Sequence, residues 1–163
     1  MNNPKQPELS SLTWEQFFDF YKPECLIERY WNINSIEQSI TTYQMTFAEM
    51  RDKFGDIKHK KYGNCEFGAL YYHEWLSYLN EISNTSKPLP VKFIGDIARW
   101  LYVKYCYFCI SDLKLLLEGI LEGKYGQFFG SIDSQLILRA FKEYDEKRRR
   151  AIYDYYEKTG TLL

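Results

Sequence analysis

The stretch that most constrains the fold lies between positions 113 and 121, where the aliphatic residues fall on one side of an α-helix. They follow the i, i+3, i+4, i+7, i+8 spacing of an apolar helical stripe: Leu113, Leu116, Leu117, Ile120 and Leu121. Apolar residues recur at three- or four-residue intervals through most of the chain, and strand-like alternation is nearly absent. We therefore predict an all-α fold, a compact bundle of six or seven helices with a long charged C-terminal helix.

Capping residues, prolines and glycines set the expected helix ends. Thr13 with Gln16, and Ser35 with Gln38, match the capping-box pattern at a helix start. Together with the apolar periodicity, such signals predict helices over residues 14–22, 24–31, 36–54, 65–82, 90–105, 112–122 and 134–159.

The 163 residues fit one domain with a core of its own. Residues 1–12 are predicted to be a flexible N-terminal lead, and residues 13–163 a single helical domain. The turn-rich stretch 84–90 is a possible boundary between two halves of that domain. The polar, basic stretch 56–64 is predicted to be a linker.

Segment Gly123–Asp133, GKYGQFFGSID, joins the last two helices, for which we expect Ser111 and Asp133 to be the N-caps. A phosphate-binding loop needs Lys and Ser or Thr together at the helix start, but here Lys124 comes first and a carboxylate opens the helix. Two interpretations remain. The glycines shape a turn whose aromatic rings pack on the core, or the loop presents those rings to a partner. The rings belong to Tyr125, Phe128 and Phe129.

Aromatic residues are abundant, with 15 Tyr, 11 Phe and 4 Trp. Tyrosine packs its ring while its hydroxyl stays hydrated, so a half-buried aromatic core is one explanation. The other is a contact surface, because Tyr and Trp are enriched at protein interfaces.

Few residues suit catalysis or metal binding. The chain has two histidines, and His73 lies mid-helix without a second histidine four residues later. Cys106 and Cys109 form a single CxxC, whereas a structural zinc site normally uses two ligand pairs. We therefore expect no enzymatic activity, no metal and no cofactor.

No apolar run approaches the roughly 18 to 20 residues that span a bilayer. The first residues, MNNPKQPELSS, lack the basic start and the apolar stretch of a secretory signal. We therefore expect a cytoplasmic protein that binds no membrane. The cysteines are then expected to be reduced thiols: Cys25, Cys65, Cys106 and Cys109.

The net charge of −1 does not predict a nucleic-acid partner, but two basic runs stand out. The run Lys147–Arg150 is matched by acids four residues earlier, as expected of a solvated helix: Glu143 with Lys147, Asp145 with Arg149, Glu146 with Arg150. A less neutralised group lies beside Tyr62: Lys58, Lys60 and Lys61. Together with Arg148, Arg149 and Arg150, these lysines keep nucleic-acid binding as an alternative.

The C-terminal third resembles a group of uncharacterised small helical proteins carried by phages and mobile elements of gut bacteria. The resemblance rests on a leucine-rich helix that leads into a Gly-Lys-Tyr-Gly motif, an aromatic pair and an Asp-capped helix. The matching positions are Gly123, Lys124, Tyr125, Gly126, Phe128, Phe129, Asp133, Phe141, Tyr144 and Arg148. The arrangement is also similar to phage helicase loaders, and this likeness implies an accessory role in replication.

We expect a non-catalytic adaptor that binds another protein, such as a replicative helicase or another DNA-transaction protein. Tyr125, Phe128 and Phe129 are the predicted apolar anchors. Arg148, Arg149 and Arg150 are the predicted charged rim. A phage-encoded inhibitor of a host enzyme would use the same physics, so the sequence leaves that alternative open.

Overall fold

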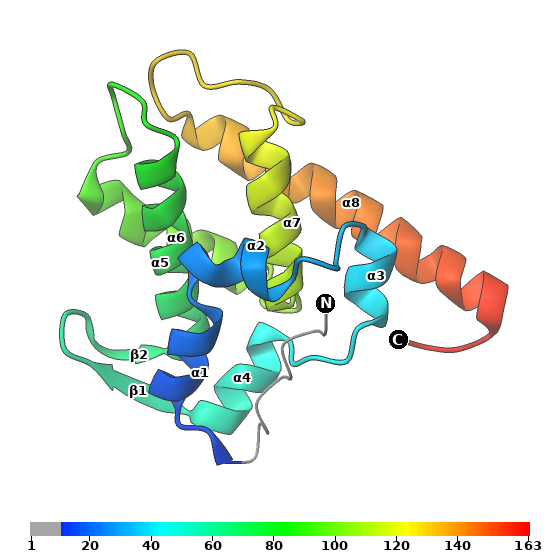
Figure 1. Ribbon diagram of the computed structural model, residues 1–163. Helices are drawn as coiled ribbons and strands as arrows, with labels where there is room; N and C mark the ends of the chain where they lie inside the picture. Colours follow the sequence, from blue (N-terminus) through cyan, green and yellow to red (C-terminus); the bar gives the residue numbers. More distant parts are fainter. Residues whose placement is uncertain (1–10) are drawn as a thin grey trace.

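The computed structural model describes residues 11–163 (Figure 1), so most of the predicted N-terminal lead lies outside the described residues. Within them the chain forms eight α-helices, one 3-10 helix and one antiparallel hairpin, so the fold is mostly helical but not purely α. The elements are α1 Trp14–Tyr21, η2 Pro23–Cys25, α2 Leu26–Arg29, α3 Ile36–Thr41, α4 Phe47–Phe54, β1 Asp56–His59, β2 Gly63–Glu66, α5 Phe67–Ile82, α6 Val91–Lys104, α7 Ile110–Leu121 and α8 Ser134–Thr159. None of these helices is long and apolar enough to span a bilayer.

The helix predicted over residues 36–54 is two helices, α3 and α4, with a non-helical segment between them. The hydroxyls of Thr41 and Thr42 donate to the carbonyls of Glu37 and Gln38 at the end of α3. Such side-chain bonds compete with the helical ladder. A second capping box, formed by Thr46 and Glu49, then starts α4.

The predicted linker 56–64 is wrong, because β1 and β2 pair there as a short hairpin. Ile57 faces Cys65 across the ladder and is buried, which anchors the hairpin to the body. Gly63 has a φ of +71°, a left-handed conformation that favours glycine in the turn. Near the turn, Nδ1 of His59 accepts hydrogen bonds from the backbone N–H groups of Lys61 and Tyr62.

The core is aromatic, and several of its buried tyrosines, together with Trp75, have their side-chain polar atoms hydrogen-bonded. The hydroxyl of Tyr72 donates to the carbonyl of Tyr105 at 2.9 Å, and Nε1 of Trp75 donates to the carbonyl of Leu113 at 3.1 Å. Both side chains come from α5, which packs along α6 and against α4. Part of the high tyrosine content is therefore explained by the core.

α7 begins two residues earlier than predicted. Cys109, not Ser111, is the N-cap, and the carboxylate of Asp112 accepts a hydrogen bond from the Cys109 N–H at 2.8 Å. Asp112 is fully buried, and it also accepts hydrogen bonds from Ser39, Tyr144 and Arg148. This shared carboxylate joins α3, α7 and α8.

Candidate functional site

The loop between α7 and α8 is largely built into the protein. Tyr125 is 5% exposed, and its ring lies so close to Gly119 that a Cβ there would approach it to 2.8 Å. Arg139 donates to the Tyr125 carbonyl at 2.9 Å. The expectation that Tyr125 contacts a partner is therefore corrected, whereas Phe128 is half-buried and Phe129 is 88% exposed.

The same loop is tied to the stretch 84–90. The N–H of Lys87 donates to the carbonyl of Gly130 at 3.0 Å, and the N–H of Ile132 donates to the carbonyl of Lys87 at 2.9 Å. Gly130 has a φ of +80°, so its glycine is required by the turn itself. The glycines of this segment thus serve a turn that closes one end of the molecule.

The predicted charged rim is also corrected in part. Arg148 is 8% exposed and its Nε lies 3.1 Å from Oδ2 of Asp112, so it stabilises the interior. Nε of Arg149 lies 3.1 Å from Oδ2 of Asp145. Of the three ion pairs predicted for the run Lys147–Arg150, this is the one whose charged atoms lie within 4 Å of each other. Arg150 is exposed.

The loop and the arginines do not form one surface. Arg149 lies fifteen residues after Ser134, the first residue of α8, which corresponds to about 22 Å along the helix axis. Figure 1 shows the loop at one end of α8, whereas residues 148–150 come after the midpoint of this 26-residue helix. Phe129 and the exposed arginines could therefore contact only different parts of a partner.

The basic group on the hairpin is exposed. Lys58, Lys60 and Lys61 all lie in solvent, and none has a carboxylate within 4 Å among residues 11–163. The ammonium of Lys61 lies 5.3 Å from the ring centroid of Tyr62. The hairpin places these three cations close together in the sequence and on one element, so nucleic-acid binding still has a candidate site.

α6 has a second apolar face that the protein does not cover. Its inner face is buried against the body through Ile94, Ala98, Leu101 and Tyr102. On the outer side, Phe93 is 46%, Trp100 62% and Val103 70% exposed. Positions 93, 100 and 103 lie on one side of a helix with 3.6 residues per turn. We call Phe93, Trp100 and Val103 the α6 patch.

A shallow depression of about 520 Å³ lies over the Trp100 and Val103 part of the α6 patch. It is lined by Asp96, Arg99, Trp100, Val103 and Lys104. Three cations, Lys92, Arg99 and Lys104, accompany one acid on the exposed side of α6. No carboxylate lies within 4 Å of these cations among the described residues. The patch therefore combines an apolar centre with an uncompensated positive border.

Other large apolar side chains are exposed in smaller groups or singly, with Tyr153 and Tyr156 three residues apart on α8 and Ile27 four residues before Trp31. Tyr43 is 89% exposed between α3 and α4, and Phe129 stands at the tip of its loop. Single exposed apolar side chains are normal on soluble proteins, whereas a contiguous apolar group with a polar rim marks an interaction site. The α6 patch is the stronger candidate on this criterion.

The described His, Cys, Asp and Glu residues were the candidates for metal binding and nucleophilic chemistry. No three of the His, Cys, Asp and Glu residues between positions 11 and 163 lie close enough together to hold a metal ion. Burial raises the pKa of Cys109 to about 12, so its thiol stays protonated at neutral pH. Cys109 is therefore a poor nucleophile despite its CxxC spacing with Cys106.

The α6 patch was missed by the sequence reasoning, although a signal for it exists. Ile94, Ala98, Leu101 and Tyr102 make one face of α6 apolar. Phe93, Trp100 and Val103 remain on the opposite face, so the helix is apolar on two sides. A helix that is apolar on two sides is either buried on both or covered by a partner.

Comparison with known proteins gives no relative for the chain: no family model matches, and there is no significant match among curated proteins or among solved structures.

Proposed function

We propose that the protein is a non-catalytic adaptor that binds another protein through the α6 patch. The observation that carries this proposal is the exposure of Trp100 and Val103, side by side on a helix whose other face fills the core. Tryptophan is the side chain most enriched among residues that dominate binding energy at interfaces. Covering these side chains would recover hydrophobic free energy that the monomer leaves in water.

The chemistry of the patch indicates the kind of partner. Its apolar centre suits an amphipathic helix, which presents an apolar stripe of similar width. Its border carries Lys92, Arg99 and Lys104 against Asp96. A partner helix with Asp or Glu beside its apolar stripe would match this border, and such complementarity raises specificity and the association rate.

Quantitative pull-down from a lysate of the source cells tests the proposal. The wild type is compared with a Trp100→Ser, Val103→Ser double variant and with Phe129→Ser, which changes an even more exposed ring elsewhere. The double variant should lose at least tenfold of the captured partner while Phe129→Ser retains it. Loss in Phe129→Ser alone would assign recognition to the loop. Loss in neither variant would reject both surfaces.

The more specific expectations about the partner and its process remain predictions. A role in replication, a helicase or other DNA-transaction protein as partner, and inhibition of a host enzyme all depend on the identity of the bound protein. Mass spectrometry of the captured material would decide among them.

A second candidate function is nucleic-acid binding through the hairpin. It is favoured by the three exposed lysines, Lys58, Lys60 and Lys61, beside the ring of Tyr62. This candidate predicts an affinity for single-stranded DNA that falls steeply with salt. Replacing the three lysines with Gln should abolish binding at low salt, whereas the Trp100→Ser variant should bind as the wild type does.

A further inference from the structure

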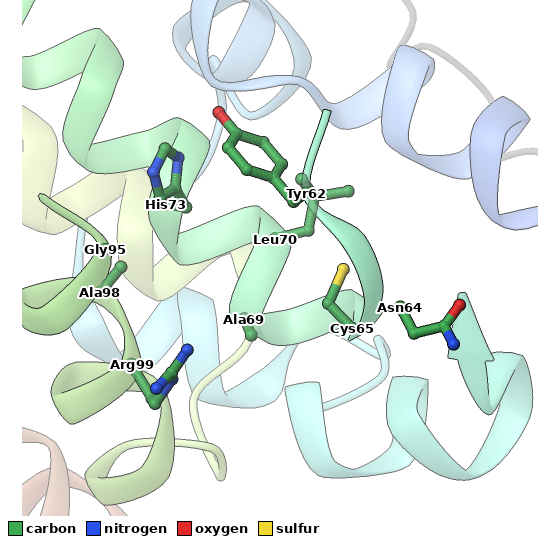
Figure 2. A pocket seen from close by; sticks show the side chains of 9 residues that line it. All are labelled: Tyr62, Asn64, Cys65, Ala69, Leu70, His73, Gly95, Ala98 and Arg99. Atoms are coloured by element: carbon green, nitrogen blue, oxygen red, sulfur yellow. The ribbon is translucent and has the colours of Figure 1, made fainter. Parts of the chain in front are cut away.

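A cavity of about 270 Å³ opens where the hairpin meets α5 and α6 (Figure 2). The hairpin contributes Tyr62, Asn64 and Cys65. α5 contributes Ala69, Leu70 and His73, and the flank of α6 contributes Gly95, Ala98 and Arg99. Except for Arg99, none of these residues lines the depression over the α6 patch, so the cavity is a separate feature.

Gly95 is the residue in this wall that packing does not explain. It lies in the interior of α6, where glycine is roughly 0.5–1 kcal/mol less favourable than alanine. A Cβ built on Gly95 would meet no atom within 4 Å, and its φ is not positive. Gly68, at the start of α5, differs because a Cβ there would lie 2.1 Å from the ring of Tyr102. Gly68 is needed for packing, whereas Gly95 keeps space open in the cavity.

Arg99 supplies an unpaired positive charge at the edge of this space. Among residues 11–163 it has no carboxylate within 4 Å, although Asp96 lies three residues earlier on the same helix. Figure 2 shows its guanidinium extending from α6 toward the space between α6 and the hairpin. A guanidinium stays charged at every relevant pH and binds a carboxylate through two parallel hydrogen bonds.

The tilted rings of Tyr62 and His73 form an aromatic part of the lining. The ring centroids of Tyr62 and His73 lie 4.5 Å apart, and His59 stacks on Tyr62 at 4.9 Å with an interplanar angle of 21°. The Tyr62 hydroxyl donates to Oε1 of Glu74 at 3.0 Å, which fixes the ring. Burial lowers the pKa of His73, so this side chain is neutral near pH 7.

We propose that this cavity binds a small aromatic carboxylate, whose ring lies against Tyr62 and His73 and whose carboxylate is held by Arg99. The apolar side chains of Ala69, Leu70 and Ala98 contact the rest of the ring. Pockets for drug-sized ligands have volumes of about 300–1,000 Å³, so the smaller volume here suits a ligand with a single ring.

Titration of the full-length, ¹⁵N-labelled protein with benzoate, followed by amide chemical shifts, tests the proposal. Benzoate should produce saturable shifts centred on residues 62–73 and 95–99, with a dissociation constant in the millimolar range. Benzamide has the same ring without the charge, and it should bind about tenfold or more weakly. Shifts that do not saturate, or equal binding of benzamide, would overturn the proposal.

Two variants locate the site, and two controls isolate it. Arg99→Gln should weaken benzoate binding at least fivefold, and Gly95→Leu should abolish it by filling the cavity. Lys92→Gln removes an exposed charge from the same helix without lining the cavity, so it should bind benzoate like the wild type. Equal losses in Lys92→Gln and Arg99→Gln would show a nonspecific charge effect and contradict the assignment.

Benzoate binding can be tested separately from the proposed adaptor function. Trp100→Ser removes the centre of the α6 patch but none of the side chains around the cavity, so it should still bind benzoate. The spectrum of each unliganded variant reports whether it is folded. Arg99 is exposed, so Arg99→Gln keeps the test decisive even if Gly95→Leu does not fold.

Discussion

Asp112 and Arg148, between α7 and α8, are buried and bonded to each other, whereas Arg99 and Lys104 on α6 lie in solvent without an acidic partner among residues 11–163. Both regions lie on helices that fill the core with one face. In the first region, the polar groups form hydrogen bonds that join α3, α7 and α8. The second leaves charges, apolar rings and a helix glycine without an internal role.

This difference separates residues needed for the fold from residues available to other molecules. A buried charge is tolerated where its hydrogen bonds are complete, and its removal then destabilises the fold. An exposed tryptophan beside unpaired cations adds little to folding. Substitutions in the two regions should therefore have different consequences, and the following predictions test that contrast.

Arg148→Met should cause the largest loss of stability. It keeps the aliphatic stem but leaves the Asp112 carboxylate buried without its ion-pair partner, which costs about 3–5 kcal/mol of unfolding free energy. Arg150→Met, two residues later in solvent, should change that free energy by less than about 0.5 kcal/mol. Urea denaturation followed by circular dichroism measures both. Similar unfolding midpoints for the two variants would contradict the assignment of Arg148 to the interior.

Gly68→Ala should cost about 1–3 kcal/mol, because the added methyl overlaps the ring of Tyr102. That ring cannot easily move away, since its hydroxyl donates a hydrogen bond to Glu66. The same denaturation experiment measures the loss. A Gly68→Ala protein as stable as the wild type would show that the contact between α5 and α6 adjusts freely.

Acidification should destabilise the protein partly through His73. Burial lowers its pKa in the folded state, with Lys61 and His59 adding to the effect and Glu74 opposing it. The unfolded chain therefore binds a proton more readily, so stability is lost as pH falls below about 6.5. One group contributes a slope of at most about 1.4 kcal/mol per pH unit. Unfolding free energies of His73→Phe should fall less between pH 7 and 5.5 than those of the wild type, and parallel curves would refute this.

Gly95→Ala should have a small effect of the opposite sign. Its methyl has open space and the position is helical, so the unfolding free energy should rise by about 0.5–1 kcal/mol. The contrast with Gly68→Ala then compares two glycines on adjoining helices. A destabilised Gly95→Ala protein would mean that the space beside Arg99 is not open in solution.

Much of the helical framework could be predicted from local signals. α1, α5, α6 and α8 begin and end within about two residues of their predicted bounds, because caps and apolar spacing act within a few residues. The break between α3 and α4 depends on threonine hydroxyls that bond to the helix carbonyls. The hairpin has a single buried residue, Ile57, in β1 and therefore no alternating pattern.

The predicted site failed where it depended on long-range contacts. Arg148 reads as one of four basic residues on a solvated helix, and its partner lies 36 positions earlier in the sequence. The residues around Tyr125 in the sequence are compatible with a buried or an exposed ring. The contact of its ring with Gly119 shows that the ring is buried. The α6 patch was accessible to periodicity analysis, because both faces of that helix are apolar in the sequence.

Site-specific photo-crosslinking tests the central claim most directly. A benzophenone amino acid is placed at position 100 in one protein and at position 129 in another, and both are irradiated in a lysate of the source cells. The account predicts a discrete adduct with another protein from position 100 and none from position 129. An adduct from position 129 alone, or a position-100 adduct consisting only of two copies of this chain, would contradict it.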